Sequence, residues 1–206
     1  MPRPRLLHVF STFSAGGPQV RFATLANAWG DRFEHIVQAS DNRFEARDLL
    51  DPQVPFRIAR DMPPLKGRGL PATLWSIGWY LRRLKPDLLL TYNWGAAEVA
   101  LSNRLIGRRR HVHHEDGFGP DEAVQQNPRR VRFRRHALPG AHTVIVPSRN
   151  LERIAHDIWG LQRVRYIPNG VRLADFDHEP MTSALPGLHK QPGSLWVGCV
   201  GGLRAE

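Results

Sequence analysis

The sequence is poor in cysteine and has no long apolar run. Cys199 is the single cysteine among 206 residues, which excludes an intramolecular disulfide and a cysteine-ligated metal cluster. No apolar segment approaches the roughly 18 residues of a membrane-spanning helix, and the N-terminus lacks a signal-peptide pattern. We therefore expect a globular protein that resides in the cytoplasm.

Negative charge is also scarce relative to positive charge. The formal net charge is +10, and much of the excess lies in two arginine clusters, residues 108–110 and residues 129–135. Such clusters could hold the phosphates of nucleic acid, anionic lipid headgroups or an acidic substrate, or they could be solvated helix surfaces. No nucleic-acid-binding motif accompanies them, so we expect no nucleic-acid partner.

Residues 5–30 predict a strand, a glycine turn and a helix. Gly16 and Gly17 interrupt a short apolar run, Pro18 suits a first helical turn, and helical spacing of apolar residues continues to Gly30. In open α/β sheets such a turn lies at the carboxyl end of a strand, where ligands bind. The turn matches neither GxGxxG nor a P-loop. It either brings the backbone close to a phosphate or sugar, or it simply reverses the chain.

Strand and helix patterns alternate along the rest of residues 1–174. Apolar runs predict strands over residues 33–39, 55–59, 87–92, 110–114, 142–146 and 164–167. Helical spacing predicts helices over residues 70–84, 96–106, 128–138 and 149–159. The last helix has Ser148 as its N-cap and Glu152 as the expected capping-box partner. This order predicts an α/β fold with a Rossmann-like parallel sheet and helices on both faces.

The C-terminal part has a different composition. Residues 175–194 are polar and carry three prolines, which is typical of a linker. Residues 195–206 resemble a buried strand and a glycine turn, and such a strand needs neighbours that this sequence does not supply. We therefore expect one domain over residues 1–174, a linker over 175–194, and the first strand and turn of a truncated second domain over 195–206.

The densest cluster of reactive side chains is HHEDGFG, residues 113–119, at the carboxyl end of a predicted strand. Histidines and carboxylates at this density suit acid/base chemistry, hydrogen bonding to hydroxyls or metal binding. Side chains alternate along a strand, so His111 and His113 share one face and His114 lies on the other, which disfavours a compact zinc site. We expect one histidine with Glu115 or Asp116 in a cleft. The alternative is one packed histidine with solvated neighbours.

Several segments together resemble a known enzyme family. The order of LLHVFSTFSAGG, HHEDGFG, VPSRNLERIAHDIWG, YIPNGV and VGCVGGLRAE is similar to the N-terminal half of family 4 retaining glycosyltransferases of the GT-B type. The resemblance implies two Rossmann-like domains facing a cleft, the first holding mainly the acceptor and the second the donor. It implies transfer from a UDP, GDP or ADP sugar to a glycan, lipid-linked or small-molecule acceptor, as in polysaccharide assembly. The transfer would retain configuration and need no cofactor or metal, and this chain alone would be inactive.

The resemblance also assigns roles to individual residues. His113 is the first choice for the histidine beside the transferred sugar, His114 is the second, and Glu115 is the third catalytic candidate. Gly16 and Gly17 would approach the phosphate and sugar of the donor. The other substrate-binding candidates are Gln19, Asn93, Asp116, Gly117, Phe118, Asn169 and Gly170.

The sequence departs from the family pattern in its last third. Arg172 stands where an aspartate often follows IPNGV, and Gly202 stands where an arginine is common. We expect Gly202 and Arg204 to contact the phosphates of the donor, with Arg204 supplying the positive charge. The donor-binding carboxylate motif of the family would lie beyond residue 206.

A function of another class is the alternative. The same sheet could serve as a non-catalytic binding module for an anionic ligand or a lipid surface. The basic segment 129–135 could contact an anionic membrane at its inner face, as peripheral members of such families do. Nucleic-acid binding would depend on charge alone.

Overall fold

The computed structural model describes residues 2–65, 67, 69–119, 122, 125–177 and 193–198. The chain divides into two compact units, residues 1–169 and residues 170–206. The predicted partition into a domain over 1–174, a linker and a second domain stays a prediction. Cys199, Gly202 and Arg204 lie outside the described residues.

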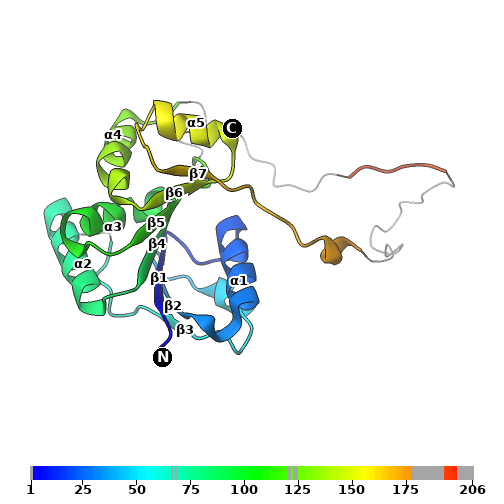
Figure 1. Cartoon of the computed structure of the whole chain (residues 1–206), viewed down its shortest axis with the longest axis horizontal. Helices are drawn as coiled ribbons and strands as arrows, with labels where there is room; N and C mark the ends of the chain where they lie inside the picture. Colours follow the sequence, from blue (N-terminus) through cyan, green and yellow to red (C-terminus); the bar gives the residue numbers. More distant parts are fainter. Residues whose placement is uncertain are drawn as a thin grey trace. The chain divides into compact units, whose positions relative to one another are not determined.

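The first unit is built around one parallel sheet, with strand order β3-β2-β1-β4-β5-β6-β7 (Figure 1). The strands are β1 (Arg5–Phe10), β2 (Glu34–Ala39), β3 (Phe56–Ile58), β4 (Leu88–Tyr92), β5 (His111–His114), β6 (Thr143–Val146) and β7 (Val164–Tyr166). Each strand falls on a predicted apolar run, and neighbouring strands pair in parallel. The predicted Rossmann-like α/β fold is confirmed.

Helices cover both faces of this sheet (Figure 1). On one face, α1 (Gly17–Trp29) packs Phe22 against Phe10 and Val37. The helices on the other face are α2 (Leu70–Leu84), α3 (Ala97–Ser102), α4 (Pro128–Ala137) and α5 (Arg149–Asp157). These helices bury the strand side chains that point to their face of the sheet, including Leu89 and Val144. Short helical turns are η1 (Gly30–Arg32), η2 (Glu45–Leu49), η3 (Trp94–Ala96), η4 (Asn103–Gly107), η6 (Leu138–Gly140) and η7 (Leu173–Phe176).

The helix ends follow the predicted signals at most positions. α1 stops at Gly30, whose φ of 61° is readily adopted by glycine. α2 occupies its predicted range and stops at Lys85, which adopts the left-handed conformation directly before Pro86. Ser148 caps α5, because its hydroxyl accepts a hydrogen bond from the backbone N–H of Leu151 at 3.2 Å.

One predicted helix changes type along its length, and one predicted helix cap was wrong. The helix expected over residues 96–106 is regular only to Ser102 and continues as the wider turn η4. There the Asn103 amide bonds both backbone groups of Arg109, at 2.8 and 3.0 Å, which ends the regular pattern. Glu152 forms no capping box, because it lies one residue beyond the N3 position of Leu151. Its carboxylate instead pairs with Arg149 at 2.8 Å.

The buried strand predicted to start at residue 195 is absent from the described residues 193–198. These residues have no regular structure, and Leu195 and Val197 are 86% and 90% exposed. A strand requires a neighbour for its backbone hydrogen bonds, and no described strand pairs with this segment. Most of the predicted linker lies outside the described residues.

Candidate functional site

The sheet reverses its strand order between β1 and β4, since the chain winds outward from β1 in one direction and from β4 in the other. In open α/β sheets, ligands bind beyond the carboxyl ends of the strands at such a switch point. A cavity of about 700 Å³ occurs at this place. Its lining residues are Ser11, Pro18, Leu65, Asn93, Trp94, Gly95, Glu98, Asp116, Gly117, Phe118, Gly119, Glu122, Arg130 and Arg134. We call it the carboxyl-edge cavity.

Three loops are held together at the floor of this cavity. Gly95 lies so close to the loop after β1 that a Cβ atom there would come within 2.3 Å of the Ser11 Cβ. Asn93, at the end of β4, has a φ of 56°, a conformation that asparagine tolerates better than most residues. Its side-chain oxygen accepts a hydrogen bond from the backbone N–H of Asp116 at 2.7 Å. The loops after β1, β4 and β5 are therefore fixed relative to one another.

An ion pair marks the rim of the cavity. Arg21 on α1 donates to both carboxylate oxygens of Asp116, at 2.5 and 3.0 Å, and to the side-chain oxygen of Asn169 at 2.8 Å. The two charged side chains are 25% and 15% exposed. A bidentate guanidinium orients a carboxylate firmly. Asp116 is thus presented to the cavity as a fixed anion with lone pairs left for other donors.

Arg134 on α4 is a buried cation beneath the same cavity, 1% exposed. Its guanidinium lies 5.0–5.5 Å from the ring centroids of Trp94, Phe118 and Trp159. Two of its nitrogens donate to Glu122 at 3.1 and 3.2 Å. Burial raises the pKa of Glu122, but hydrogen bonds from Arg134 and a neighbouring arginine outweigh it and hold that pKa below its ordinary value. The pair anchors the loop after β5 onto α4.

His113 and Glu115 lie under this loop and are each 1% exposed. The Oγ1 atom of Thr91 is 2.8 Å from His113 Nδ1 and 2.7 Å from His111 Nε2. Glu115 Oε2 lies 3.4 Å from His113 Nε2 and from Arg134 Nε. His113, the first-choice catalytic histidine, and Glu115 line none of the cavities described here. The contacts of both residues indicate a positioning role.

His114 points to the opposite face of the sheet, as the alternation predicted. It stacks on Tyr92 with ring centroids 4.9 Å apart and lines a second cavity of about 300 Å³ between α1 and the sheet, together with Arg21 and Asn169. Burial, and to a lesser degree the Arg21 charge, lowers the pKa of His114 to about 4. His114 is therefore neutral near pH 7, and Arg21, which lines the same cavity, pairs with Asp116 of the carboxyl-edge cavity.

The other predicted site residues are distributed unevenly. Asn93, Asp116, Gly117 and Phe118 line the carboxyl-edge cavity. Gly16 and Gly17 are exposed at the start of α1, next to Pro18 of the cavity wall. Gln19 is 6% exposed, and its amide donates to the Thr12 carbonyl at 2.8 Å, so it braces the glycine turn. Gly170 belongs to the second unit and is exposed there.

Sequence reasoning missed several residues of the site. Arg21, Trp94, Glu98 and Glu122 were not singled out, and Arg130 and Arg134 were read only as part of a surface cluster. Arg21 has no local signal, because its partner Asp116 is 95 residues away. Asn93 and the segment HHEDGFG, both at carboxyl ends of predicted strands, are the patterns that pointed to this cavity.

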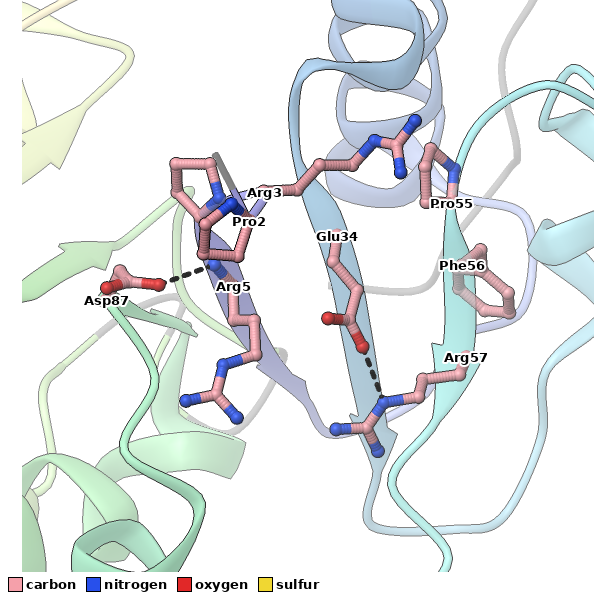
Figure 2. Close-up of a pocket in the computed structure, with 9 residues that line it drawn as sticks. Pro2, Arg3, Arg5, Glu34, Pro55, Phe56, Arg57 and Asp87 are labelled. Atoms are coloured by element: carbon pink, nitrogen blue, oxygen red, sulfur yellow. Dashed lines mark hydrogen bonds and ion pairs between the residues drawn. The ribbon is translucent and has the colours of Figure 1, made fainter.

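A larger cavity lies at the opposite edge of the sheet, near the amino ends of β1, β2 and β3 (Figure 2). It measures about 730 Å³ and contains three arginines. Arg57 is paired with Glu34 at 2.8 Å, Arg3 is paired with Asp31 at 2.8 Å, and Arg5 donates to the Lys85 carbonyl at 2.9 Å. All three arginines already have hydrogen-bond partners, and the cavity lies at the edge where α/β sheets rarely bind ligands. It is therefore a weaker candidate.

Two further properties bear on the chemistry of the site. Across the described residues, no three histidine, cysteine, aspartate or glutamate side chains converge to hold a metal ion. Among the same residues, no helix combines the length and apolarity needed to cross a membrane.

Comparison with known protein families gives a match over most of the chain. The family described as "Glycosyl transferase 4-like domain" matches residues 16–170, which include Gly16 and Gly17, Asn169, and every lining residue of the carboxyl-edge cavity except Ser11. The chain belongs to this family. The resemblance noted in the sequence is thereby confirmed, and a comparison with curated proteins gave no match.

Solved structures share the fold of this glycosyl transferase 4-like domain. HepE of Anabaena, in complex with UDP and glucose, has a TM-score of 0.61 at 20% identity, covering 85% of this chain and 47% of its own. Sucrose-phosphate synthase from Thermosynechococcus elongatus has a TM-score of 0.57 at 20% identity, covering 84% and 49%. A shorter chain of that synthase has a TM-score of 0.52 at 16% identity, and the match covers 84% of this chain and 92% of that chain. This chain therefore spans about half the length of the two larger proteins.

Proposed function

We propose that this domain holds the acceptor in a glycosyl transfer from a nucleotide sugar, and that a second domain of a longer protein presents the donor. The observation that carries the proposal is the polar, aromatic-lined cavity at the switch point of a glycosyl transferase 4-like domain. The HepE structure with UDP and glucose supports a nucleotide-sugar donor. The UDP, GDP or ADP type of donor belongs to the proposal.

Asp116 is the central acceptor-binding residue of the proposed site. Arg21 holds the Asp116 carboxylate in one orientation, so the remaining lone pairs of this carboxylate can accept hydrogen bonds from sugar hydroxyls. Asn93 fixes the backbone of the same loop. Trp94 and Phe118 in the cavity wall supply aromatic surface for the C–H faces of a sugar ring. The acceptor we propose is a glycan or a lipid-linked sugar.

The histidines have different roles in this proposal. His114 is neutral near pH 7 and contacts the substrate as a hydrogen-bonding group on the α1 side, close to Asn169. His113 and Glu115 position the loop from below. Gly16 and Gly17 leave room for the donor at the start of α1. The proposed transfer retains configuration, needs no separate cofactor and takes place in the cytoplasm.

A transfer assay with the full-length protein tests the proposal. UDP-, GDP- and ADP-sugars are supplied singly with glycan and lipid-linked acceptors, and the product configuration is read by NMR. We expect transfer with at least one donor, unchanged by EDTA, and none from residues 1–206 alone. The proposal would be refuted if no donor in the panel gave either transfer or hydrolysis.

The alternative, a binding module for an anionic ligand, predicts free positive charge beside the cavity. Arg134 and Arg130 are instead paired with Glu122, and Arg21 is paired with Asp116. The cavity therefore offers hydrogen-bond acceptors as well as cations, which favours a hydroxyl-rich ligand. Tight binding of inorganic phosphate without any transfer would support the alternative.

A further inference from the structure

The outer side of α2 carries an unusually exposed aromatic stripe. Trp75 and Trp79 are 60% and 50% exposed, although tryptophan is usually largely buried. Their rings pack edge to face with centroids 5.9 Å apart. Arg82, one turn further along the same side of the helix, places its guanidinium 5.7 Å from the Trp79 ring.

The turn η4 extends this surface. Figure 1 shows α2 and α3 side by side, and η4, which continues α3, packs on α2. The packing is close, because a Cβ atom on Gly78 would lie 2.5 Å from the Ile106 Cβ. Arg82 also donates to the Ile106 carbonyl at 2.7 Å. Leu105, which precedes Ile106 in η4, is 53% exposed. We call Trp75, Trp79, Arg82 and Leu105 the α2 face.

The sequence around the α2 face is mainly basic, with Asp61, Asp87 and Glu98 as the acidic residues that border it. Residues 62–86 and 99–114 contain nine lysines and arginines and no aspartate or glutamate. Of these, Arg82, Arg83, Lys85, Arg104, Arg108 and Arg110 are exposed. Arg83 pairs with Asp61 at 3.2 Å, and Arg104 reaches the His136 carbonyl. Arg82, which lies over the Trp79 ring, and the exposed Lys85, Arg108 and Arg110 supply the remaining positive charge of these two segments.

We propose that the α2 face binds the surface of an anionic lipid bilayer. Tryptophan rings favour the headgroup level of a membrane, where one part is apolar and another is wet. Flanking arginines are attracted to the negative surface potential of anionic lipids, each by about fivefold in partition coefficient. Aromatic and basic groups together on one helix face are the pattern of an interfacial contact.

The α4 surface, where the sequence placed the membrane contact, is less suitable. Arg134 is buried and Arg130 lines the carboxyl-edge cavity. Phe133, the aromatic residue of this segment, packs against Trp94 with ring centroids 5.4 Å apart. The exposed arginines of α4 thus lack an exposed aromatic partner. The α2 face combines exposed arginine with exposed aromatic side chains, and we therefore assign the lipid contact to this face.

Vesicle flotation with the full-length protein tests this assignment. The vesicles contain equal parts phosphatidylglycerol and phosphatidylcholine, or phosphatidylcholine alone. We expect binding to the anionic vesicles only, a loss of more than about tenfold in the double variant Trp75→Ser/Trp79→Ser, and a loss of about fivefold in Arg82→Gln. The matched control Arg129→Gln/Arg132→Gln on α4 should bind like the parent.

Several results would overturn the assignment: unchanged binding in the double tryptophan variant, equal loss in the α4 control, or a dimer that the tryptophan substitutions dissociate without any vesicle binding. Circular dichroism confirms that each variant is folded. If the double variant does not fold, Leu105→Ser takes its place and must weaken binding. Flotation needs no sugar donor, so its outcome is independent of the proposed transfer activity.

Discussion

Acidification should destabilise this domain well above the pH at which carboxylates titrate. Four histidines of the sheet have lowered pKa values: His8, His35 and His111, which are buried, and His114, which is partly buried. Burial lowers the pKa of His35 to about 4, of His111 to about 3 and of His114 to about 4. Burial and the neighbouring His35 hold the pKa of His8 well below its ordinary value.

The sign of the effect follows from where protons bind. In the unfolded chain these histidines have a pKa near 6.5 and take up protons as the pH falls below it, whereas the folded protein keeps them neutral down to about pH 4. The free energy of unfolding therefore decreases by about 1.4 kcal/mol per pH unit for each histidine. Between pH 6.5 and 5 this amounts to about 1.5 kcal/mol each and about 6 kcal/mol for all four, comparable to the total stability of many domains.

Urea unfolding at pH 7.5, 6.5, 5.5 and 5.0, followed by tryptophan fluorescence at constant ionic strength, measures this slope. His35→Phe removes one titrating ring whose Nε2 has no hydrogen-bond partner, and its slope should be shallower by about 1.4 kcal/mol per pH unit. His142→Asn, at an exposed position, is the control and should leave the slope unchanged. A stability that stays level from pH 6.5 to 5 would refute the reasoning.

Three substitutions test the packing of the site and of α5. Gly95→Ala should lower the free energy of unfolding by about 1–3 kcal/mol, because the new methyl group overlaps the neighbouring loop. Gly17→Ala, with open space around it, should leave the stability nearly unchanged. Equal melting temperatures for the two variants would contradict this prediction. Arg134→Leu leaves the buried Glu115 carboxylate without its arginine and removes one of the two arginines paired with Glu122. It should lower the free energy of unfolding in urea by about 3–5 kcal/mol, so a neutral result would disprove the anchoring role. Ser148→Ala should cost about 1 kcal/mol through the lost cap on Leu151, and an unchanged unfolding midpoint would count against it.

The sequence predicted the fold well because local patterns determine most of it. Apolar runs of four to six residues mark buried parallel strands, and glycine and proline mark the ends, as at Gly30 and Pro86. The details that failed depend on longer-range contacts or on a single residue of spacing. The Asn103 amide bonds that end α3 early could not be inferred from a helical pattern.

The site was predicted only in part, for a physical reason. Residues at the carboxyl ends of strands, such as Asn93 and Asp116, are recognisable because the topology collects them at one edge. The choice between His113 and His114 depends on which sheet face is open, and this depends on how the helices pack. Likewise, Arg134 resembles its exposed neighbours in sequence, and only the tertiary structure buries it among aromatic rings.

The most direct test of the proposed acceptor site is the dependence of the transfer rate on acceptor concentration, measured for the full-length protein and for Asp116→Asn. Removing the charge that Arg21 orients should raise the acceptor KM by about 10- to 100-fold, the value of a hydrogen bond to a charged group, and leave the donor KM unchanged. Arg57→Gln, at the opposite edge of the sheet, should match the parent protein. An unchanged acceptor KM in Asp116→Asn, or a rise confined to the donor KM, would contradict the assignment of this cavity to the acceptor.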